Sequence, residues 1–190
     1  MIKNIEDRVV GLMLLLMAAP VMALVAIAVK LESKGPILFR QKRLGFNNEM
    51  IDVYKFRSMY TDMTDAQASK LVTKDDPRVT RVGRIIRRTS LDELPQLFNV
   101  LKGDMSFVGP RPERPAFTTA LDESIPFYSI RHAVRPGITG WSQVKGRNAL
   151  DWEEKLELDE GEDIIVTSKP VEGAVRYEVQ HASTAEFVEV

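Results

Sequence analysis

Two adjacent carboxylates, Asp92 and Glu93, stand in a stretch of the sequence that is rich in arginine. Arg87 and Arg88 precede them, and Arg111 follows them after a glycine and a proline. A carboxylate can act as a nucleophile or help to hold a divalent cation, and a guanidinium matches the oxygens of a phosphate group. The stretch from residue 84 to 112 therefore brings together residue types that could bind phosphate or a metal ion, although acids at a helix start are also ordinary capping residues.

The two carboxylates are expected in the first turn of a helix. Proline is tolerated only in a first turn, so Pro95 places the helix start near Ser90 to Asp92. Ser90 and Glu93 match a capping box, and Gly103 predicts the helix end. Acids are ordinary in a first turn, but that end of the helix dipole also attracts phosphate. Apolar residues recur at helical spacing: Leu91, Leu94, Leu97, Phe98 and Leu101.

The run from Arg88 to Pro112, RTSLDELPQLFNVLKGDMSFVGPRP, resembles the signature of the bacterial sugar transferase family, the monotopic polyprenyl-phosphate phosphoglycosyl transferases. The resemblance also covers FRQKRLG from Phe39, YKFRSM from Tyr54 and YSIRHAVRPGITGWSQVKGRN from Tyr128. It continues to about Asp159 and then stops, where the family's last apolar helix is replaced by an acidic segment.

The resemblance implies an enzyme that transfers a phospho-sugar from a UDP-sugar to undecaprenyl phosphate, a polyprenyl phosphate, and releases UMP. Asp92 matches the family's nucleophile, which forms a covalent aspartyl-phosphosugar intermediate. Glu93, together with Asp92, would hold Mg²⁺. Such a step is the first membrane reaction in the assembly of exopolysaccharide, O-antigen or another glycan.

The expected substrate-binding residues are mostly cationic. Three arginines would neutralise the reacting phosphorus: Arg87, Arg88 and Arg111. Further residues are candidates to bind phosphate or the nucleotide: Arg135, Gln143 and Arg147. The resemblance also places the predicted hairpin by the active site, with Lys55 and Arg57. His132 is expected to be structural, because a lone histidine is more often structural than catalytic.

Composition limits the other classes of site. The chain has 190 residues and no cysteine, which excludes a disulfide framework and a thiolate zinc site. Residues 1–150 carry 23 basic and 15 acidic side chains, whereas residues 151–190 carry 3 and 12. The basic part suits phosphate or anionic membrane lipid. Nucleic acid is not an expected partner, because no recognition module is present.

The segment from Val9 to Val29 has 21 residues without a charge, enough to span a membrane. Pro20 near its middle favours a broken helix that enters and returns on one face. A single-pass helix and a cleaved signal peptide are the alternatives. Basic residues flank the segment on both sides, which favours two ends on the cytoplasmic face of the bacterial inner membrane.

The predicted fold class is α+β. We expect a re-entrant membrane helix in residues 1–31, a catalytic domain in 32–160 and a divergent acidic tail in 161–190. The catalytic domain is expected to be mostly helical, with a hairpin of residues 36–41 and 51–56, a basic amphipathic helix over 78–87 and a helix over 115–130. Short β-strands are expected in the tail, and a homo-oligomer is possible.

The sequence is also compatible with a second function. The chain could be a catalytically inactive, membrane-anchored module whose basic face binds anionic lipid or phosphate. Such a module needs lysine and arginine, but it does not need Asp92 and Glu93, which would repel a lipid phosphate unless a metal ion lay between them.

Overall fold

The computed structural model describes residues 2–63, 76–125 and 128–145, together with the backbone of three strands within residues 164–189. The chain divides into two compact units. The first comprises Met1–Arg43 and Ile51–Asp104, and the second Leu44–Met50 and Met105–Val190. Helices and small separate sheets make up both, which confirms the α+β class. The polar segment before Asp76, for which the sequence allows a helical stretch over 65–72, lies outside the described residues.

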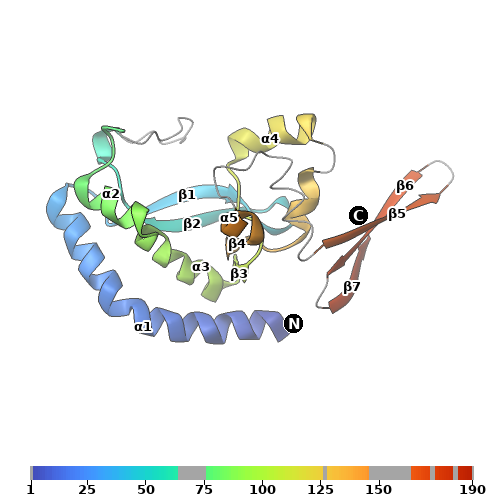
Figure 1. Cartoon of the computed structure of the whole chain (residues 1–190), viewed down its shortest axis with the longest axis horizontal. Helices are drawn as coiled ribbons and strands as arrows, with labels where there is room; N and C mark the ends of the chain where they lie inside the picture. Colours follow the sequence, from blue (N-terminus) through green and yellow to red (C-terminus); the bar gives the residue numbers. More distant parts are fainter. Residues whose placement is uncertain are drawn as a thin grey trace. The chain divides into compact units, whose positions relative to one another are not determined.

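The first unit begins with the long helix α1, Ile2–Glu32, which contains Pro20. The helix continues through the proline without a break, and Figure 1 shows that it bends sharply near its middle. A proline kinks a helix because it removes one hydrogen bond and its ring collides with the preceding turn. Pro20 therefore bends α1 and does not divide it into two helices.

Among the described residues, α1 is the one helix with the length and composition to cross a membrane. Most of its apolar side chains are exposed, including Leu16 and Met17, which are 67% and 76% exposed. A helix that exposes so many apolar groups requires an apolar solvent or partner. The re-entrant path through one leaflet stays a prediction.

The end of α1 is held by Arg57, which directly follows the predicted hairpin. That hairpin consists of β1, Leu38–Leu44, and β2, Met50–Phe56. The Arg57 guanidinium donates hydrogen bonds to the carbonyl oxygens of Val29, Ser33, Lys34 and Pro36 at 3.3, 2.8, 2.8 and 2.7 Å. The last carbonyls of a helix lack partners within the helix. Arg57, only 4% exposed, supplies a donor to one of these carbonyls, that of Val29, and to three carbonyls just beyond the helix, contacts that its sequence context did not predict. Its role in substrate binding stays a prediction.

The same end of α1 also caps the next helix, α2, Arg81–Arg88. The two carboxylate oxygens of Glu32 accept hydrogen bonds from the backbone N–H groups of Arg81 and Val82 at 2.7 and 3.0 Å. A carboxylate satisfies two of the unpaired N–H groups there and complements the helix dipole. The predicted basic helix is thus present but shorter. Arg78 lies before it and forms an ion pair with Asp76 at 2.6 Å.

The core of the first unit joins α1 to the elements that carry the carboxylate pair. Val25 and Val29 of α1 pack with Phe56 of β2 and Ile86 of α2. Partly buried leucines that flank the pair also pack against this cluster: Leu91 and Leu94. Burial of such side chains contributes about 1.5–3 kcal/mol each. The apolar core therefore fixes the segment around Asp92 against the membrane helix.

The second unit contains a short parallel pair, β3, Ser106–Val108, and β4, Gly137–Thr139. Its helices are α4, Pro115–Ser124, and α5, Trp141–Lys145. The helix predicted for 115–130 ends at Ser124, because Ile125 is extended, as a residue before proline prefers. A separate 3₁₀ helix follows, Tyr128–Ala133.

The tail forms the expected short strands. These are β5, Ile164–Val171, β6, Ala174–His181, and β7, Thr184–Glu189. They pair antiparallel in the order β5-β6-β7.

His132 is buried in the second unit at 5% exposure, and neither ring nitrogen has a hydrogen-bond partner among the described residues. Its ring meets the edge of Tyr128 at 6.1 Å. Burial, aided by the neighbouring Arg131 cation, lowers the pKa of His132 to about 4. The side chain is therefore neutral in the folded protein at physiological pH.

We expect Arg57→Met to lower the free energy of unfolding by roughly 2–4 kcal/mol, because it leaves buried carbonyls at the end of α1 without donors. Arg57→Lys should recover only part of this, since an ammonium cannot reproduce the guanidinium fork. Thermal unfolding in detergent measures the effect. The control is Arg84→Met, which removes an exposed arginine of α2 and should change stability little. Equal stability of the Arg57 and Arg84 variants would contradict the anchoring role.

His132 should make the folded state less stable in acid. Its pKa is about 4 when folded, below the ordinary 6.5, so the unfolded chain takes up the proton first as pH falls. From pH 7 to 4.5 this linkage removes about 2–3 kcal/mol. His132→Leu lacks the titrating group and should show a smaller decline in unfolding temperature over that range. Identical declines in the two proteins would exclude this linkage.

Candidate functional site

Asp92 and Glu93 lie in the first turn of a 3₁₀ helix, Leu91–Gln96, which leads into α3, Leu97–Lys102. The predicted single helix is thus divided, with Pro95 inside the 3₁₀ part. The capping box is not formed. Ser90 adopts a left-handed conformation with φ 58° and its side chain makes no capping hydrogen bond. Gly103 ends α3 as expected, at φ 90°.

Glu93 forms an ion pair with Lys55 of β2, with 2.7 Å between Oε1 and Nζ. Both side chains are largely withdrawn from water, with exposed fractions of 17% for Lys55 and 20% for Glu93. An ion pair in such surroundings is screened less than one on the surface. The hairpin and the carboxylate pair are therefore linked directly, as the resemblance implied for Lys55.

Asp92 is half-buried beside this ion pair. Burial raises the pKa of the Asp92 carboxyl above its ordinary value, and the negative charge of Glu93 raises it further. The cations Lys55 and Arg87 act in the opposite direction and lower it. Asp92 is thus a carboxylate with reduced hydration whose charge depends on two neighbouring cations. These are the surroundings in which a carboxylate gains nucleophilic reactivity.

Asn99 fixes the distance between the strand that carries Lys55 and the helix that follows the carboxylates. It is fully buried. Its Oδ1 accepts from the Tyr54 backbone N–H at 3.1 Å, and its Nδ2 donates to the Asp52 carbonyl at 2.7 Å and to Asp104 Oδ2 at 3.1 Å. Such a saturated amide holds β2 against α3 in one register. No spacing rule in the sequence distinguished Asn99, because it is one polar residue within an apolar helical run.

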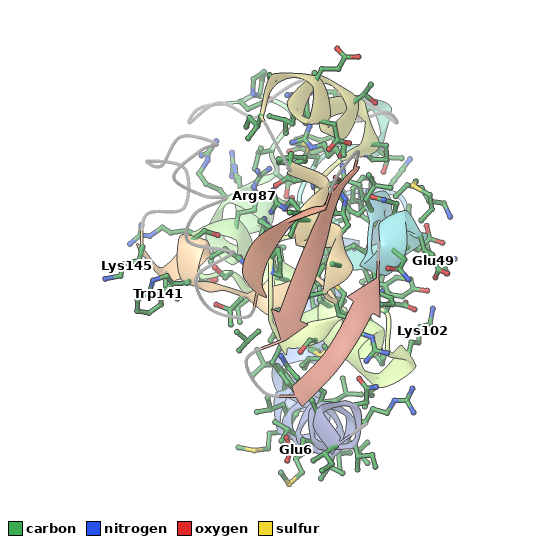
Figure 2. The ribbon with its side chains drawn as sticks, turned by 90° about the vertical axis from the view of Figure 1, so that its right-hand side faces the viewer. Glu6, Glu49, Arg87, Lys102, Trp141 and Lys145 are labelled. Atoms are coloured by element: carbon green, nitrogen blue, oxygen red, sulfur yellow. The ribbon has the colours of Figure 1, made fainter. Side chains whose placement is uncertain are left out.

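The arginines before the carboxylates occupy the last turn of α2. Arg87, marked in Figure 2, is half-buried, and its charge acts on Asp92. Arg88 is exposed at the end of the helix. The first unit therefore brings Lys55, Arg87, Asp92 and Glu93 into one group. Arg88 follows Arg87 as the last residue of α2.

The second unit holds its own polar group. Arg111 Nη1 donates to Gln143 Oε1 at 3.0 Å, and Arg131 Nη2 donates to the Arg111 carbonyl at 3.1 Å. Arg135 is half-buried and precedes β4. These residues belong together because Gly109 and Gly137 bring their two backbone segments into contact, where a Cβ on either glycine would overlap the other segment. Arg147 lies outside the described residues.

The carboxylate pair can be tested for its fit to Mg²⁺. Among the described residues, no group of three or more His, Cys, Asp or Glu side chains is placed to hold a metal ion. Mg²⁺ does not require one, because it keeps several waters and takes one or two carboxylates together with substrate phosphates. Asp92 and Glu93 fit that ligand set. They do not fit a cation that needs a complete cage of protein ligands.

The chain matches the family model described as bacterial sugar transferase over residues 1–161. It is 56% identical over 147 residues to an undecaprenyl-phosphate glucose phosphotransferase from Komagataeibacter xylinus, covering 76% of this chain and 28% of that protein. It is 49% identical over 158 residues to a UDP-glucose:undecaprenyl-phosphate glucose-1-phosphate transferase from Escherichia coli K12, covering 83% and 34%.

A third relative is a UDP-N-acetylgalactosamine-undecaprenyl-phosphate N-acetylgalactosaminephosphotransferase from Aeromonas hydrophila. It is 45% identical over 161 residues, covering 83% of this chain and 38% of the relative. The chain thus spans about a third of the length of these curated relatives. The family match covers most of the chain and includes the carboxylate pair, the hairpin and the membrane helix. The chain therefore belongs to the bacterial sugar transferase family.

Proposed function

We propose that this chain is a sugar-1-phosphate transferase that moves a phospho-sugar from a UDP-sugar to undecaprenyl phosphate. The observation that carries the proposal is the half-buried Asp92 beside the Lys55–Glu93 ion pair, in a chain of this family. By their names, the Escherichia coli relative acts on UDP-glucose and the Aeromonas hydrophila relative on UDP-N-acetylgalactosamine, and all three act on undecaprenyl phosphate. These two sugars are the first candidate donors.

In the first step, a carboxylate oxygen of Asp92 attacks the β-phosphorus of the UDP-sugar. A bond forms between that oxygen and the phosphorus, and the bond to the oxygen bridging the two phosphates breaks, so that UMP leaves with that oxygen. The product on the protein is an aspartyl phospho-sugar, a mixed anhydride. Covalent catalysis of this kind divides one displacement into two easier ones.

In the second step, a phosphate oxygen of undecaprenyl phosphate attacks the same phosphorus. The bond to Asp92 breaks, its carboxylate is restored, and the sugar leaves on a lipid diphosphate. Asp92 is suited to both roles, because reduced hydration favours attack while the nearby cations Lys55 and Arg87 favour the ionised form that leaves. The product would enter exopolysaccharide, O-antigen or related glycan assembly.

The cations would stabilise the charge that develops on the phosphorus oxygens. Arg87 and Arg88 lie at the end of α2, directly before the carboxylate pair. Arg111, Arg135, Gln143 and Arg147 remain candidates for the nucleotide and its phosphates. Mg²⁺, if bound by Glu93 and Asp92, would neutralise the diphosphate of the donor. Lys55 keeps Glu93 in place at 2.7 Å and so orients the pair.

The exposed apolar face of α1 supports a place at the membrane, where the acceptor lipid is found. We propose the cytoplasmic face of the bacterial inner membrane, because nucleotide sugars are cytoplasmic substrates and basic residues flank both ends of the apolar segment. The acceptor phosphate would then meet the site at headgroup depth. Anionic lipid and further copies of the chain are the other proposed partners.

The direct test is UMP release from purified protein in detergent with Mg²⁺, across several UDP-sugars, with and without undecaprenyl phosphate. Lipid-dependent release with one sugar would support the reaction and identify the donor. If folded protein released no UMP with any donor, the alternative of a catalytically inactive module that binds lipid or phosphate would be favoured.

Asp92→Asn should abolish the covalent adduct and reduce turnover on the order of a thousandfold or more, because the amide is a poor nucleophile. The adduct is measured by intact-protein mass spectrometry after incubation with the UDP-sugar alone. Asp62→Asn, which neutralises an exposed carboxylate in the first unit, is the matched control and should retain both. Normal turnover by the Asp92 variant would refute the assignment of the nucleophile.

Lys55→Met should reduce kcat/KM on the order of a hundredfold, because it removes a positioned charge beside the reacting group. Lys55→Arg retains a cation that can still pair with Glu93 and should lose less. The measurement is kcat/KM for the UDP-sugar at saturating lipid. Comparing the two variants separates the effect of losing the positive charge from the effect of changing the side chain. If both variants lost the same activity, the charge of Lys55 would not be the relevant property.

A further inference from the structure

Two cations of the first unit lie against the Tyr54 side chain, and a third contacts the backbone of one of them. Lys102 Nζ donates to the Tyr54 hydroxyl at 2.7 Å and lies 4.7 Å from the ring centroid. The Arg40 guanidinium carbon lies 5.5 Å from the same centroid. Arg8 Nη2 donates to the Lys102 carbonyl at 3.5 Å. We call Arg8, Arg40 and Lys102 the Tyr54 cation cluster.

None of these three cations forms an ion pair with a carboxylate in the part of the chain that is described. The neighbouring lysines differ, since Lys42 pairs with Asp52 at 3.1 Å and Lys55 with Glu93. Two acidic residues, Glu6 and Asp7, precede Arg8 on α1, and neither accepts a hydrogen bond from it. The charges of Asp104 and Asp52 act on Lys102, but Lys42 pairs with Asp52, so the region keeps an excess of positive charge that favours an anion.

The cluster lies at the edge of the apolar surface of α1. Arg8 directly precedes Val9, the first residue of the uncharged segment, and Val9 and Leu12 are 54% and 51% exposed. When these side chains contact lipid tails, Arg8 reaches the headgroup layer, because a charged head seeks the water boundary. Its depth is therefore set by the helix itself.

Packing brings α3 to the same depth. A Cβ placed on Gly11 would lie 3.4 Å from the Leu101 side chain, so the end of α3 rests directly on this turn of α1. Lys102 follows Leu101 and is exposed, and Figure 2 shows it extending away from the ribbon. The Arg8 guanidinium also comes within 3.0 Å of a Cβ placed on Gly103. The helices therefore hold Arg8 and Lys102 close together at the membrane boundary.

We propose that Arg8, Arg40 and Lys102 bind the phosphate of an anionic phospholipid headgroup. A guanidinium offers a planar fork to two phosphate oxygens, and an ammonium offers a point charge. The adjoining exposed face of α1 accommodates the acyl chains, which favours a lipid over free phosphate. The proposal rests on the membrane location given under the proposed function, but not on its chemistry.

The test uses full-length protein in neutral detergent at low ionic strength and measures phosphatidylglycerol bound per chain by native mass spectrometry, with phosphatidylcholine as the zwitterionic reference. A single change, Arg8→Gln, Arg40→Gln or Lys102→Gln, should weaken phosphatidylglycerol binding about fivefold, and all three together about a hundredfold. Binding of phosphatidylcholine should hardly change. The charge-preserving set Arg8→Lys, Arg40→Lys and Lys102→Arg should retain most of the binding and shows that folding is not the cause.

A matched control removes the same charge elsewhere, with Lys34→Gln, Arg84→Gln and Lys145→Gln, all at exposed positions. If this triple variant lost as much affinity as the cluster variant, general electrostatic attraction would explain the binding and the proposal would be overturned. Displacement of the lipid by millimolar inorganic phosphate would likewise overturn a lipid site in favour of a soluble anion. Asp92→Asn should bind the lipid normally. The lipid site can therefore be judged by this binding measurement even if the proposed catalysis proves wrong.

Discussion

The capped end of α1 is the contact on which the rest of the first unit depends. A membrane helix that ends in protein leaves carbonyl groups without donors, and the cost of burying them unpaired is high. Arg57 supplies a donor to one of these carbonyls, that of Val29, and to three carbonyls of the segment that directly follows α1, while Glu32 extends from the same helix to the first N–H groups of α2. The hydrogen bonds of Arg57 and Glu32 thereby fix α1, the hairpin and α2 relative to one another.

This joint determines where the carboxylate pair lies. The hairpin that ends at Arg57 also carries Lys55, and α2 ends with Arg87, so both cations that lower the pKa of Asp92 are placed by elements attached to α1. Asn99 closes the arrangement by tying β2 to α3. A change at the end of the membrane helix would therefore move two charges relative to Asp92, even though no residue of α1 belongs to the site.

The sequence predicted the elements that follow from periodicity and turn chemistry. The hairpin, the basic helix, the Gly103 helix end and the strands of the tail are present, because each depends on neighbours in the chain. Local rules failed where tertiary contacts decide the outcome. Ser90 is left-handed instead of capping a helix, and Arg57 turns to a helix end twenty-odd residues earlier. Neither its burial nor that of Asn99 could be deduced from spacing.

The carboxylate pair itself was found because its chemistry is unusual in composition, two acids among arginines, and because the surrounding run is so similar to one family. The spacing of residues in the sequence could not predict the surroundings that distinguish the Asp92 carboxylate from the Glu93 carboxylate. Glu93 is neutralised by Lys55 at 2.7 Å, whereas Asp92 is left with burial as the dominant influence on its pKa. Two adjacent, chemically similar side chains thus have different electrostatic surroundings because of a strand that lies almost forty residues away in the chain. The asymmetry arises from the position of Lys55 on β2, and the core that packs β2 and α2 against α1 holds that position.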